Sequence, residues 1–155
     1  MEYIKNLELD EIRSGFLVTS HQKQSWNVQI NLLMEFARIC DKHHLKWFAA
    51  YGTLLGAVRH GGFIPWDSDI DVHMFRPDYE RFKQIAPNEF RYPYQFDLWY
   101  ENEDSDDAPS ETFSLLPFIK IRDLRTIVID LNESISIDVI PLDSFPSFEG
   151  EAKSK

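Results

Sequence analysis

The sequence predicts a mixed α/β fold, of the α/β or α+β class, in which a sheet is flanked by helices. Apolar residues recur at three- and four-residue steps over residues 22–43, which predicts a long amphipathic helix. Several later segments are short, rich in β-branched and aromatic residues, and separated by polar turns, as strands are. Because these helices and strands do not alternate regularly, their order argues against a parallel βαβ repeat.

The composition predicts one domain in a reducing compartment. The 155 residues, 43% of them hydrophobic, suffice for one good core and not for two ordinary domains, so we expect a single domain over residues 1–155. The formal charge of −10 disfavours nucleic acid as a partner, since nucleic-acid binders usually present a basic face. Cys40 is the one cysteine and lies in an apolar helical pattern, so we expect no disulfide and no cysteine metal site.

The two ends of the sequence lead to expectations about location and completeness. The first thirty residues hold no basic start followed by an apolar block, and no window reaches the ~18 apolar residues of a membrane span. We therefore expect no signal peptide, no membrane span, and a cytoplasmic location, either free or peripheral at the inner membrane face. The final segment SFPSFEGEAKSK forms no evident closing element, which suggests a fold truncated at its C-terminus.

The first half of the chain places a conspicuous turn between a strand and a helix. After the helix over residues 22–43, the segment KWFAAYG (46–52) predicts a short buried strand that Gly52 ends. Thr53 is a candidate cap for a short helix over residues 53–60, which a Gly-Gly break follows. The alternating segment SDIDVHMF (68–75) then predicts a strand with one face toward the core.

The second half is predicted to supply one more helix and most of the sheet. Pro77 at a first helical position opens a helix that continues to about Ala86. The acidic stretch 101–112 lacks apolar anchors and is interpreted as a surface loop. The remaining strands are expected at YQFDLWY (94–100), LLPFIKIR (115–122), RTIVIDL (125–131) and ISIDVIPL (135–142).

Closely spaced aspartates are the first candidate for chemistry. In a strand, Asp69 and Asp71 project to the same face, together with His73. Two carboxylates that close repel each other unless a cation or a proton lies between them. Hard oxygens at a fixed spacing suit Mg²⁺, or Mn²⁺, which takes one or two carboxylates together with the phosphates of a substrate. The pair therefore predicts a metal site for a phosphate-bearing ligand.

A third acid follows in a later strand. Asp138 alternates with Ile137 and Val139, and an acid in so apolar a strand needs a partner. We therefore consider Asp138 a third metal ligand or a general base. Asp143, past a proline, is interpreted as a turn residue.

Candidate donors to phosphate come from three places. The turn at Gly52 and Thr53 lets the backbone approach a ligand and presents free N–H groups at a helix start. Arg59 lies before the Gly-Gly break, and Lys120 and Arg122 share one face of a predicted strand. Each feature also has a structural interpretation: Asp-x-Asp occurs by chance in surface strands, the two basic residues could form a solvated strand face, and Asp67 could serve only to brace its turn.

The continuous segment AYGTLLGAVRHGGFIPWDSDIDV (50–72) resembles the LicD family, which includes bacterial phosphocholine transferases and fukutin-related sugar-phosphate transferases. The helix that precedes this segment, FIKIRDLRT, and IDVIPLD resemble further family segments, so that the resemblance covers roughly residues 15–145. Two departures accompany it. Ser68 stands where many relatives have an aspartate, and the chain ends soon after FEG, where relatives continue.

The resemblance implies a nucleotidyltransferase-type fold and a set of site residues. By position, Gly52 and Thr53 match the phosphate turn, Asp69 and Asp71 match the metal pair, and Asp138 matches a third acid. Lys120, Arg122 and Arg59 would then be contacts to the diphosphate. The implied reaction moves phosphocholine or a polyol phosphate from a CDP-linked donor, such as CDP-choline, to a hydroxyl of a surface glycan or a lipid-linked or teichoic-acid-like precursor.

Two other functions remain open beside this one. A nucleotidyltransferase would add a nucleoside monophosphate to a small molecule or protein and release pyrophosphate. A non-catalytic module would retain the fold without metal-dependent ligand binding. The choice of choline over ribitol or glycerol depends on the resemblance alone.

Overall fold

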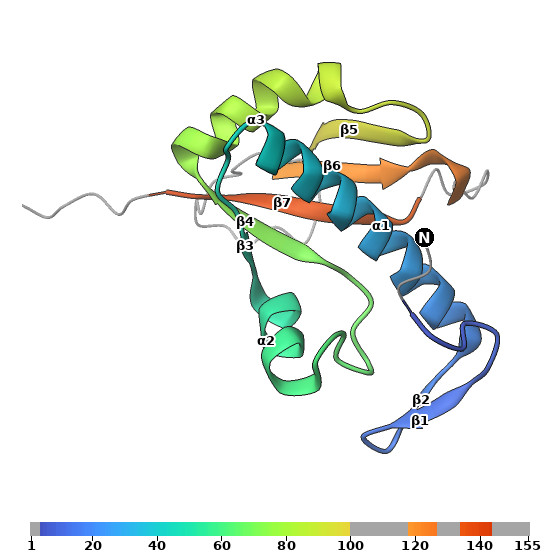
Figure 1. The fold of residues 1–155 in the computed structure, drawn as a ribbon. Helices are drawn as coiled ribbons and strands as arrows, with labels where there is room; N and C mark the ends of the chain where they lie inside the picture. Colours follow the sequence, from blue (N-terminus) through green and yellow to red (C-terminus); the bar gives the residue numbers. More distant parts are fainter. Residues whose placement is uncertain (1–3, 100–117, 127–133, 144–155) are drawn as a thin grey trace, which may run out of the picture.

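The computed structural model describes residues 4–99, 118–126 and 134–143, which form three helices around a mixed sheet (Figure 1). The predicted α/β class is confirmed. The described elements are β1 (Glu11–Arg13), β2 (Phe16–Val18), α1 (Ser20–Lys42), β3 (Phe48–Ala49), α2 (Tyr51–His60), β4 (Asp71–Phe75), α3 (Arg76–Glu89), β5 (Tyr94–Trp99), β6 (Phe118–Asp123), a 3₁₀ turn (Leu124–Thr126) and β7 (Ser136–Leu142).

The main sheet has the strand order β3-β4-β7-β6-β5, so its central strand is the last described strand of the chain. β4 and β7 are parallel, and the other three pairs are antiparallel. A parallel pair cannot be joined by a hairpin, and here sixty residues, 76–135, lie between the two strands in sequence. The sheet is therefore held together by contacts between distant parts of the chain.

The core lies between the sheet and two helices that cover one of its faces, α1 and α3 (Figure 1). Phe36 of α1 and Phe82 of α3 are fully buried and meet edge to face, with ring centroids 5.0 Å apart. They pack with inward-facing sheet residues such as Val72 and Val139. Burying one such side chain stabilises the fold by about 1.5–3 kcal/mol. The face of β4 and β7 that carries Asp71 and Asp138 points away from this core.

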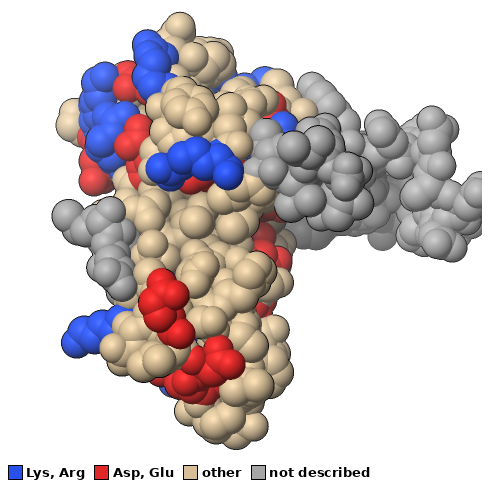
Figure 2. Space-filling model, turned by 90° about the vertical axis from the view of Figure 1, so that its right-hand side faces the viewer, with Lys and Arg blue, Asp and Glu red and all other residues tan. Residues whose placement is uncertain are grey.

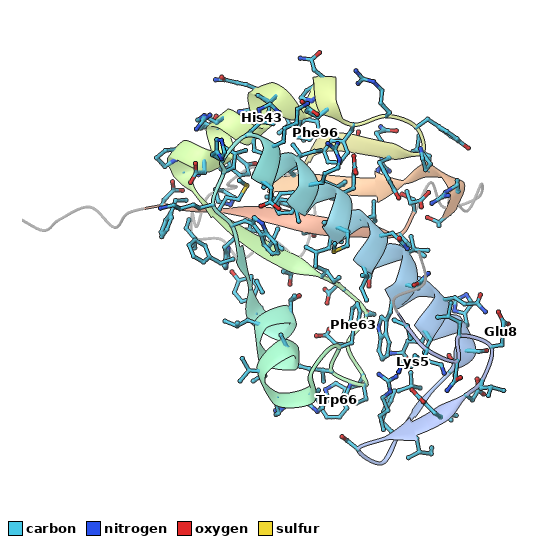
Figure 3. The ribbon with its side chains drawn as sticks, viewed as in Figure 1. Lys5, Glu8, His43, Phe63, Trp66 and Phe96 are labelled. Carbon is cyan, nitrogen blue, oxygen red and sulfur yellow. The ribbon has the colours of Figure 1, made fainter. Side chains whose placement is uncertain are left out.

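α1 is 23 residues long and extends beyond the sheet toward the β1–β2 hairpin (Figure 1). Its C-terminal half packs on the main core, and its N-terminal half buries Trp26 in a smaller cluster with Val18 and Ile4. Phe63, from the loop after α2, lies between α2 and this half of α1 (Figure 3) and stacks on Trp26 with a centroid distance of 4.7 Å. One helix thus joins the core to the loop that carries the aspartates.

Thr19→Ala is expected to lower the free energy of unfolding by about 1 kcal/mol. Thr19 is the N-cap of α1, and its side chain accepts a hydrogen bond from the Gln22 N–H at 3.2 Å. The alanine variant leaves that N–H without its partner. Urea unfolding measures the change. Ser14→Ala, in the hairpin turn outside the helix, is the control. An equal loss in both variants would contradict the assignment of the cap.

α2 packs closely against the loop after it because Gly56 has no side chain at the contact and Gly61 lets the chain turn back. A Cβ on Gly56 would lie 2.4 Å from the Gly62 carbonyl oxygen and 3.2 Å from the Ile64 nitrogen. Gly61 ends the helix in the left-handed region, with φ of 67°. The break predicted at Gly61 and Gly62 is confirmed, and it returns the chain toward α1.

Several predicted elements differ from the structure. β3 is only a two-residue edge strand, and the buried strand predicted there was wrong, since Phe48 is 45% exposed. α2 begins at Tyr51, two residues before the predicted start. Of the strand predicted over 125–131, the described part forms a 3₁₀ turn, and the rest lies outside the described residues, as does the loop at 101–112.

The charged residues show no strip of one sign on the face drawn in Figure 2. Acidic and basic side chains lie together in its upper part, and acidic side chains gather in its lower part, with a broad uncharged band between them. This face therefore gives no argument for a nucleic-acid site. Within the described ranges, no helix combines the length and the apolarity that crossing a membrane requires.

Candidate active site

The carboxylates of Asp71 and Asp138 lie on adjacent parallel strands at matched positions. The register of β4 and β7 pairs Asp71 with Asp138, and the register of β6 and β7 pairs Lys120 with Asp138. The three side chains therefore share one face of the sheet. The Lys120 Nζ lies 3.9 Å from the Asp138 Oδ1. Of the candidate residues, these three are brought together by strand pairing alone.

Thr53 holds the start of β4 in place. Its hydroxyl oxygen accepts a hydrogen bond from the Asp71 N–H at 2.9 Å, and the Ala50 N–H donates to the Asp71 carbonyl at 3.0 Å. Tyr51, between them, adopts a positive φ of 41°, an uncommon conformation for a residue other than glycine. The first turn of α2 is thus fixed directly beside Asp71. The Thr53 hydroxyl keeps its own proton to donate to a ligand.

Asp67 and Asp69 lie in the loop before β4, which begins only at Asp71. The predicted strand start at Ser68 was therefore too early. The loop turns because the Asp67 N–H donates to the Ile64 carbonyl at 2.9 Å. The Asp67 carboxylate lies against α2, where a Cβ on Gly52 would be 2.2 Å from its Oδ2. Glycine at position 52 thus makes room for a carboxylate.

The N-terminal half of α1 fixes the same loop through its backbone carbonyls. The Trp26 indole N–H donates to the Asp67 carbonyl at 2.9 Å. The Gln29 amide Nε2 donates to the Ser68 carbonyl at 2.8 Å and to the Ser136 carbonyl at 3.4 Å. These bonds tie the aspartate loop to the start of β7. The loop therefore has a defined position although it belongs to no strand.

The environment raises the pKa of the carboxyl groups of Asp67, Asp71 and Asp138. Burial and the neighbouring Asp69 raise the pKa of Asp67, and the same two causes raise that of Asp71. Burial raises the pKa of Asp138 to about 6, with Lys120 opposing and Asp71 and Asp69 adding to the rise. Each shift means that the negative charge is disfavoured where it lies. A bound cation would reverse this preference.

The carboxylates of the site fit a divalent ion that brings its own phosphate ligand. Among the described residues, no group of three or more His, Cys, Asp or Glu side chains is already arranged to hold a metal. Asp71 and Asp138 nevertheless offer paired hard oxygens, and the buried Asp138 Oδ1 has no hydrogen-bond partner within the described ranges. Mg²⁺ needs only one or two carboxylates when ligand phosphates complete its shell. The residues present therefore fit an ion that arrives with a phosphate ligand.

The candidate basic residues separate into two groups. Lys120 lies at the carboxylates, as described above. Arg122 shares its face of β6, but its Nε donates to the Asp97 carboxylate at 2.6 Å. Arg59 lies in the last turn of α2, while Gly52 and Thr53 lie in the first, about 10 Å away along the helix axis. The structure thus brings Lys120, and not Arg59, to the aspartates.

A cavity of about 520 Å³ opens beside the carboxylates, between the N-terminal half of α1 and the starts of β4 and β7. Its wall includes Gln29, Asp69, Lys120, Ser134 and Asp138. Gln29 and Ser134 were not among the predicted site residues. The available signal was a glutamine inside the apolar stripe of α1, where Gln29 is only 5% exposed.

Comparisons with known proteins place the chain in a family. Residues 44–122, just over half of the chain, match the family described as LicD/FKTN/FKRP, nucleotidyltransferase domain. A relative in Haemophilus influenzae, "Lipopolysaccharide cholinephosphotransferase LicD", is 47% identical over 58 residues, which are 37% of this chain and 22% of the relative. Human "Ribitol 5-phosphate transferase FKRP" is 33% identical over 60 residues, 36% of this chain and 12% of the relative. The chain thus matches about a fifth or less of the length of these relatives.

Proposed function

The chain belongs to the LicD/FKTN/FKRP family, and from this premise we propose that it carries the donor- and metal-binding part of a transferase of substituted phosphate groups. The donor would be a CDP-linked alcohol such as CDP-choline. The acceptor would be a hydroxyl of a cell-surface glycan, of a lipid-linked glycan, or of a teichoic-acid-like precursor. We place this reaction in the cytoplasm or at the inner membrane face.

The pairing of Asp71 with Asp138 is the observation that carries the proposal. A fold that served stability alone would gain from neutral residues there, because burial disfavours both charges. A bound metal ion would stabilise the two negative charges and so explain why carboxylates occupy these positions. Asp71 and Asp138, together with Asp69 from the loop, would hold Mg²⁺ or Mn²⁺. When bound, the ion would neutralise charge on the transferring phosphoryl group and orient it.

The chain's own groups would bind the donor and handle the proton. The first N–H groups of α2, at Gly52 and Thr53, precede its internal hydrogen bonds and can donate to phosphate oxygens. Lys120 adds positive charge at the same place. In the reaction, the acceptor oxygen forms a bond to the phosphorus that carries the alcohol, and the bond from that phosphorus to CMP breaks. The acceptor proton would pass to a carboxylate of the site, and Asp138, in the wall of the cavity beside it, is placed to take it.

The names of the relatives support transfer of a substituted phosphate as a class, but they do not decide which alcohol the phosphate carries. One relative is named for choline phosphate and the other for ribitol phosphate, and both names describe transfer of a substituted phosphate. The chain is more similar to the first over the matched segment. Choline phosphate is therefore our first choice, and ribitol or glycerol phosphate the second.

Nucleotidyl transfer is a second candidate, because the matched family is described as a nucleotidyltransferase domain. The same carboxylates and phosphate turn would serve either reaction. The products differ: a CDP-alcohol releases CMP, whereas a nucleoside triphosphate releases pyrophosphate. A donor screen with both products measured therefore distinguishes the two enzymes.

Mg²⁺-dependent thermal stabilisation by one donor is the expected result of a titration with CDP-choline, CDP-ribitol, CDP-glycerol, CTP and ATP. A ligand at 100 times its Kd stabilises the folded chain by about 2.7 kcal/mol. In a chain of this size that raises the Tm by about 5–10 °C. Asp71→Asn should abolish the response.

Asp41→Asn is the matched control, because Asp41 is exposed at the far end of α1. It should retain the full response. Three results would contradict the proposal: a response independent of Mg²⁺, a response that survives Asp71→Asn, or stabilisation by no nucleotide. The last would favour a non-catalytic module.

A further inference from the structure

The buried polar atoms without partners gather at one place in the structure. Within the described part of the chain, three buried side-chain atoms have no hydrogen-bond partner: Gln29 Oε1, Ser134 Oγ and Asp138 Oδ1. They come from α1, from the residues just before β7, and from β7 itself. All three residues line the cavity of about 520 Å³. Each unsatisfied buried polar group costs about 1–3 kcal/mol, and a polar ligand in this cavity would offset that cost.

Gln29 has one defined orientation. Its Nε2 donates to two backbone carbonyls, those of Ser68 and Ser136, which can only accept. The amide therefore cannot be turned around without losing both bonds, and Oε1 is left as the acceptor. Gln29 is 5% exposed and belongs to the cavity wall. A nearly buried acceptor is thus fixed in place with nothing from the described residues to satisfy it.

The chemistry of the wall selects among possible ligands. Gln29 Oε1 and an ionised Asp138 only accept hydrogen bonds, and Ser134 can accept or donate. Lys120 in the same wall can contact a phosphate, but a phosphate has no strong donor to offer the three unpartnered atoms, and the carboxylates of Asp69 and Asp138 repel it. Cytosine offers a single amino group. A saccharide or polyol offers a hydroxyl donor at nearly every carbon, and the cavity volume lies in the range that holds small organic ligands.

We propose that this cavity is a binding subsite for a hydroxyl-rich ligand, a saccharide or polyol, which Gln29 and Ser134 help to select. The inference deepens the proposed function, since such a ligand beside Asp138 would be either the glycan acceptor or the polyol of the donor. Its recognition does not require the metal. Binding to the subsite can therefore be measured without turnover.

The test is an NMR titration of the ¹⁵N-labelled chain without metal or nucleotide. The probes are methyl β-galactoside, methyl N-acetylglucosaminide and ribitol, with cytidine as the nucleobase probe. The Trp26 indole N–H is a suitable reporter, because Trp26 lines the cavity and donates to the Asp67 carbonyl. We expect at least one hydroxyl-rich probe to shift this signal in a saturable manner, and cytidine to leave it unchanged.

Two variants with matched controls decide whether the shift arises at the proposed atoms. Ser134→Ala removes a hydroxyl that has no hydrogen-bond partner among the described residues, so it should leave the Tm unchanged or raise it slightly while weakening binding roughly three- to tenfold. Gln29→Lys keeps a donor for the two carbonyls and removes the acceptor, with the same expected loss. Ser20→Ala and Gln24→Lys, which lie outside the wall, are the controls.

The outcomes separate this inference from the proposed function. No shift with any hydroxyl-rich probe, a shift with cytidine alone, or equal binding by both variants and controls would overturn the subsite, whatever donor the chain binds. If saccharide binding fails while a CDP-alcohol still stabilises the chain with Mg²⁺, only the subsite is wrong. If saccharides bind and no nucleotide does, the donor assignment is wrong.

The same titration in the presence of CDP-ribitol and Mg²⁺ identifies the source of the ligand. A glycoside that binds together with the nucleotide occupies an acceptor subsite. A probe that the nucleotide displaces marks a subsite for the polyol of the donor. Either result supports recognition of a hydroxyl-rich ligand.

Discussion

Asp138→Asn is expected to stabilise the free chain at pH 8 and to abolish its Mg²⁺-dependent response to a CDP-linked donor. Asparagine keeps the shape of the side chain and removes a charge that burial disfavours. The rise of the pKa from 3.8 to about 6 corresponds to at most about 3 kcal/mol. Because the side chain is 27% exposed, solvent screening reduces this to about 1–2 kcal/mol, or about 3–6 °C in Tm.

The sign of this effect depends on pH. The folded-state pKa of Asp138 lies above its unfolded value, so the folded chain holds the proton more tightly than the unfolded chain does. The contribution of this group to stability is therefore fully present below about pH 4 and is lost as the pH rises through 6. Wild type and Asp138→Asn should have equal stability near pH 4, and the variant should be the more stable one above pH 6.

Thermal melts from pH 4 to pH 8 measure the difference, and Asp143→Asn is the control with the opposite sign. Asp143 has a lowered pKa because the Arg76 guanidinium binds it, with Nε to Oδ1 at 2.6 Å. Its replacement should destabilise the chain at neutral pH. A lower Tm for Asp138→Asn at pH 8 would mean that the ion pair of Asp138 with Lys120 stabilises the fold. That result would count against the assignment of Asp138 as a metal ligand.

Gly56→Ala is expected to destabilise the chain by about 1–3 kcal/mol and to weaken donor binding as well. The new Cβ would lie 2.4 Å from a backbone oxygen, that of Gly62, which cannot rotate away. α2 would have to move from the loop that leads to Asp67. Chemical denaturation measures the first effect, and the donor titration measures the second.

Two other glycines serve as controls for this variant. Gly62→Ala should be nearly neutral, since no atom of the part of the chain that the structure describes lies within 4 Å of its added Cβ. In Gly52→Ala the clash is with the Asp67 carboxylate, at the end of a side chain that can rotate. We therefore expect Gly52→Ala to keep most of its stability and to lose donor binding. Equal stability losses in all three variants would contradict this account.

The sequence predicted what depends on local pattern. The ends of the long helix were predicted to within two residues of those of α1. The prediction succeeded because the apolar residues recur with the period of an α-helix and so form the face that contacts the core. The strands at Asp71 and Asp138 were predicted from alternation, and the short helix and its glycine break from the residues that end helices. The site residues themselves remain predictions.

The sequence could not predict how distant segments pair. Nothing in the alternation around Asp97 indicates that its carboxylate binds Arg122 across β5 and β6 and so engages a candidate phosphate contact. The orientation of Gln29 also depends on two carbonyls far away in sequence. The β1–β2 hairpin was not predicted, although a local signal for it was present. Ser14 and Gly15 both adopt positive φ in its turn, and Ser-Gly is a sequence that can form such a two-residue turn.

The position of β7 in the middle of the sheet has a consequence for folding. Until β7 inserts, β3 with β4 and β5 with β6 are two separate pairs, each with an unpaired edge toward the gap. Closure of the gap pairs residues that are more than sixty positions apart in sequence, which favours slow folding. The intermediates expose unpaired strand edges and are therefore prone to aggregate. Asp138 arrives on the closing strand. A chain that has not completed its sheet therefore lacks the Asp71–Asp138 pair, and the full set of carboxylates is assembled only in the native state.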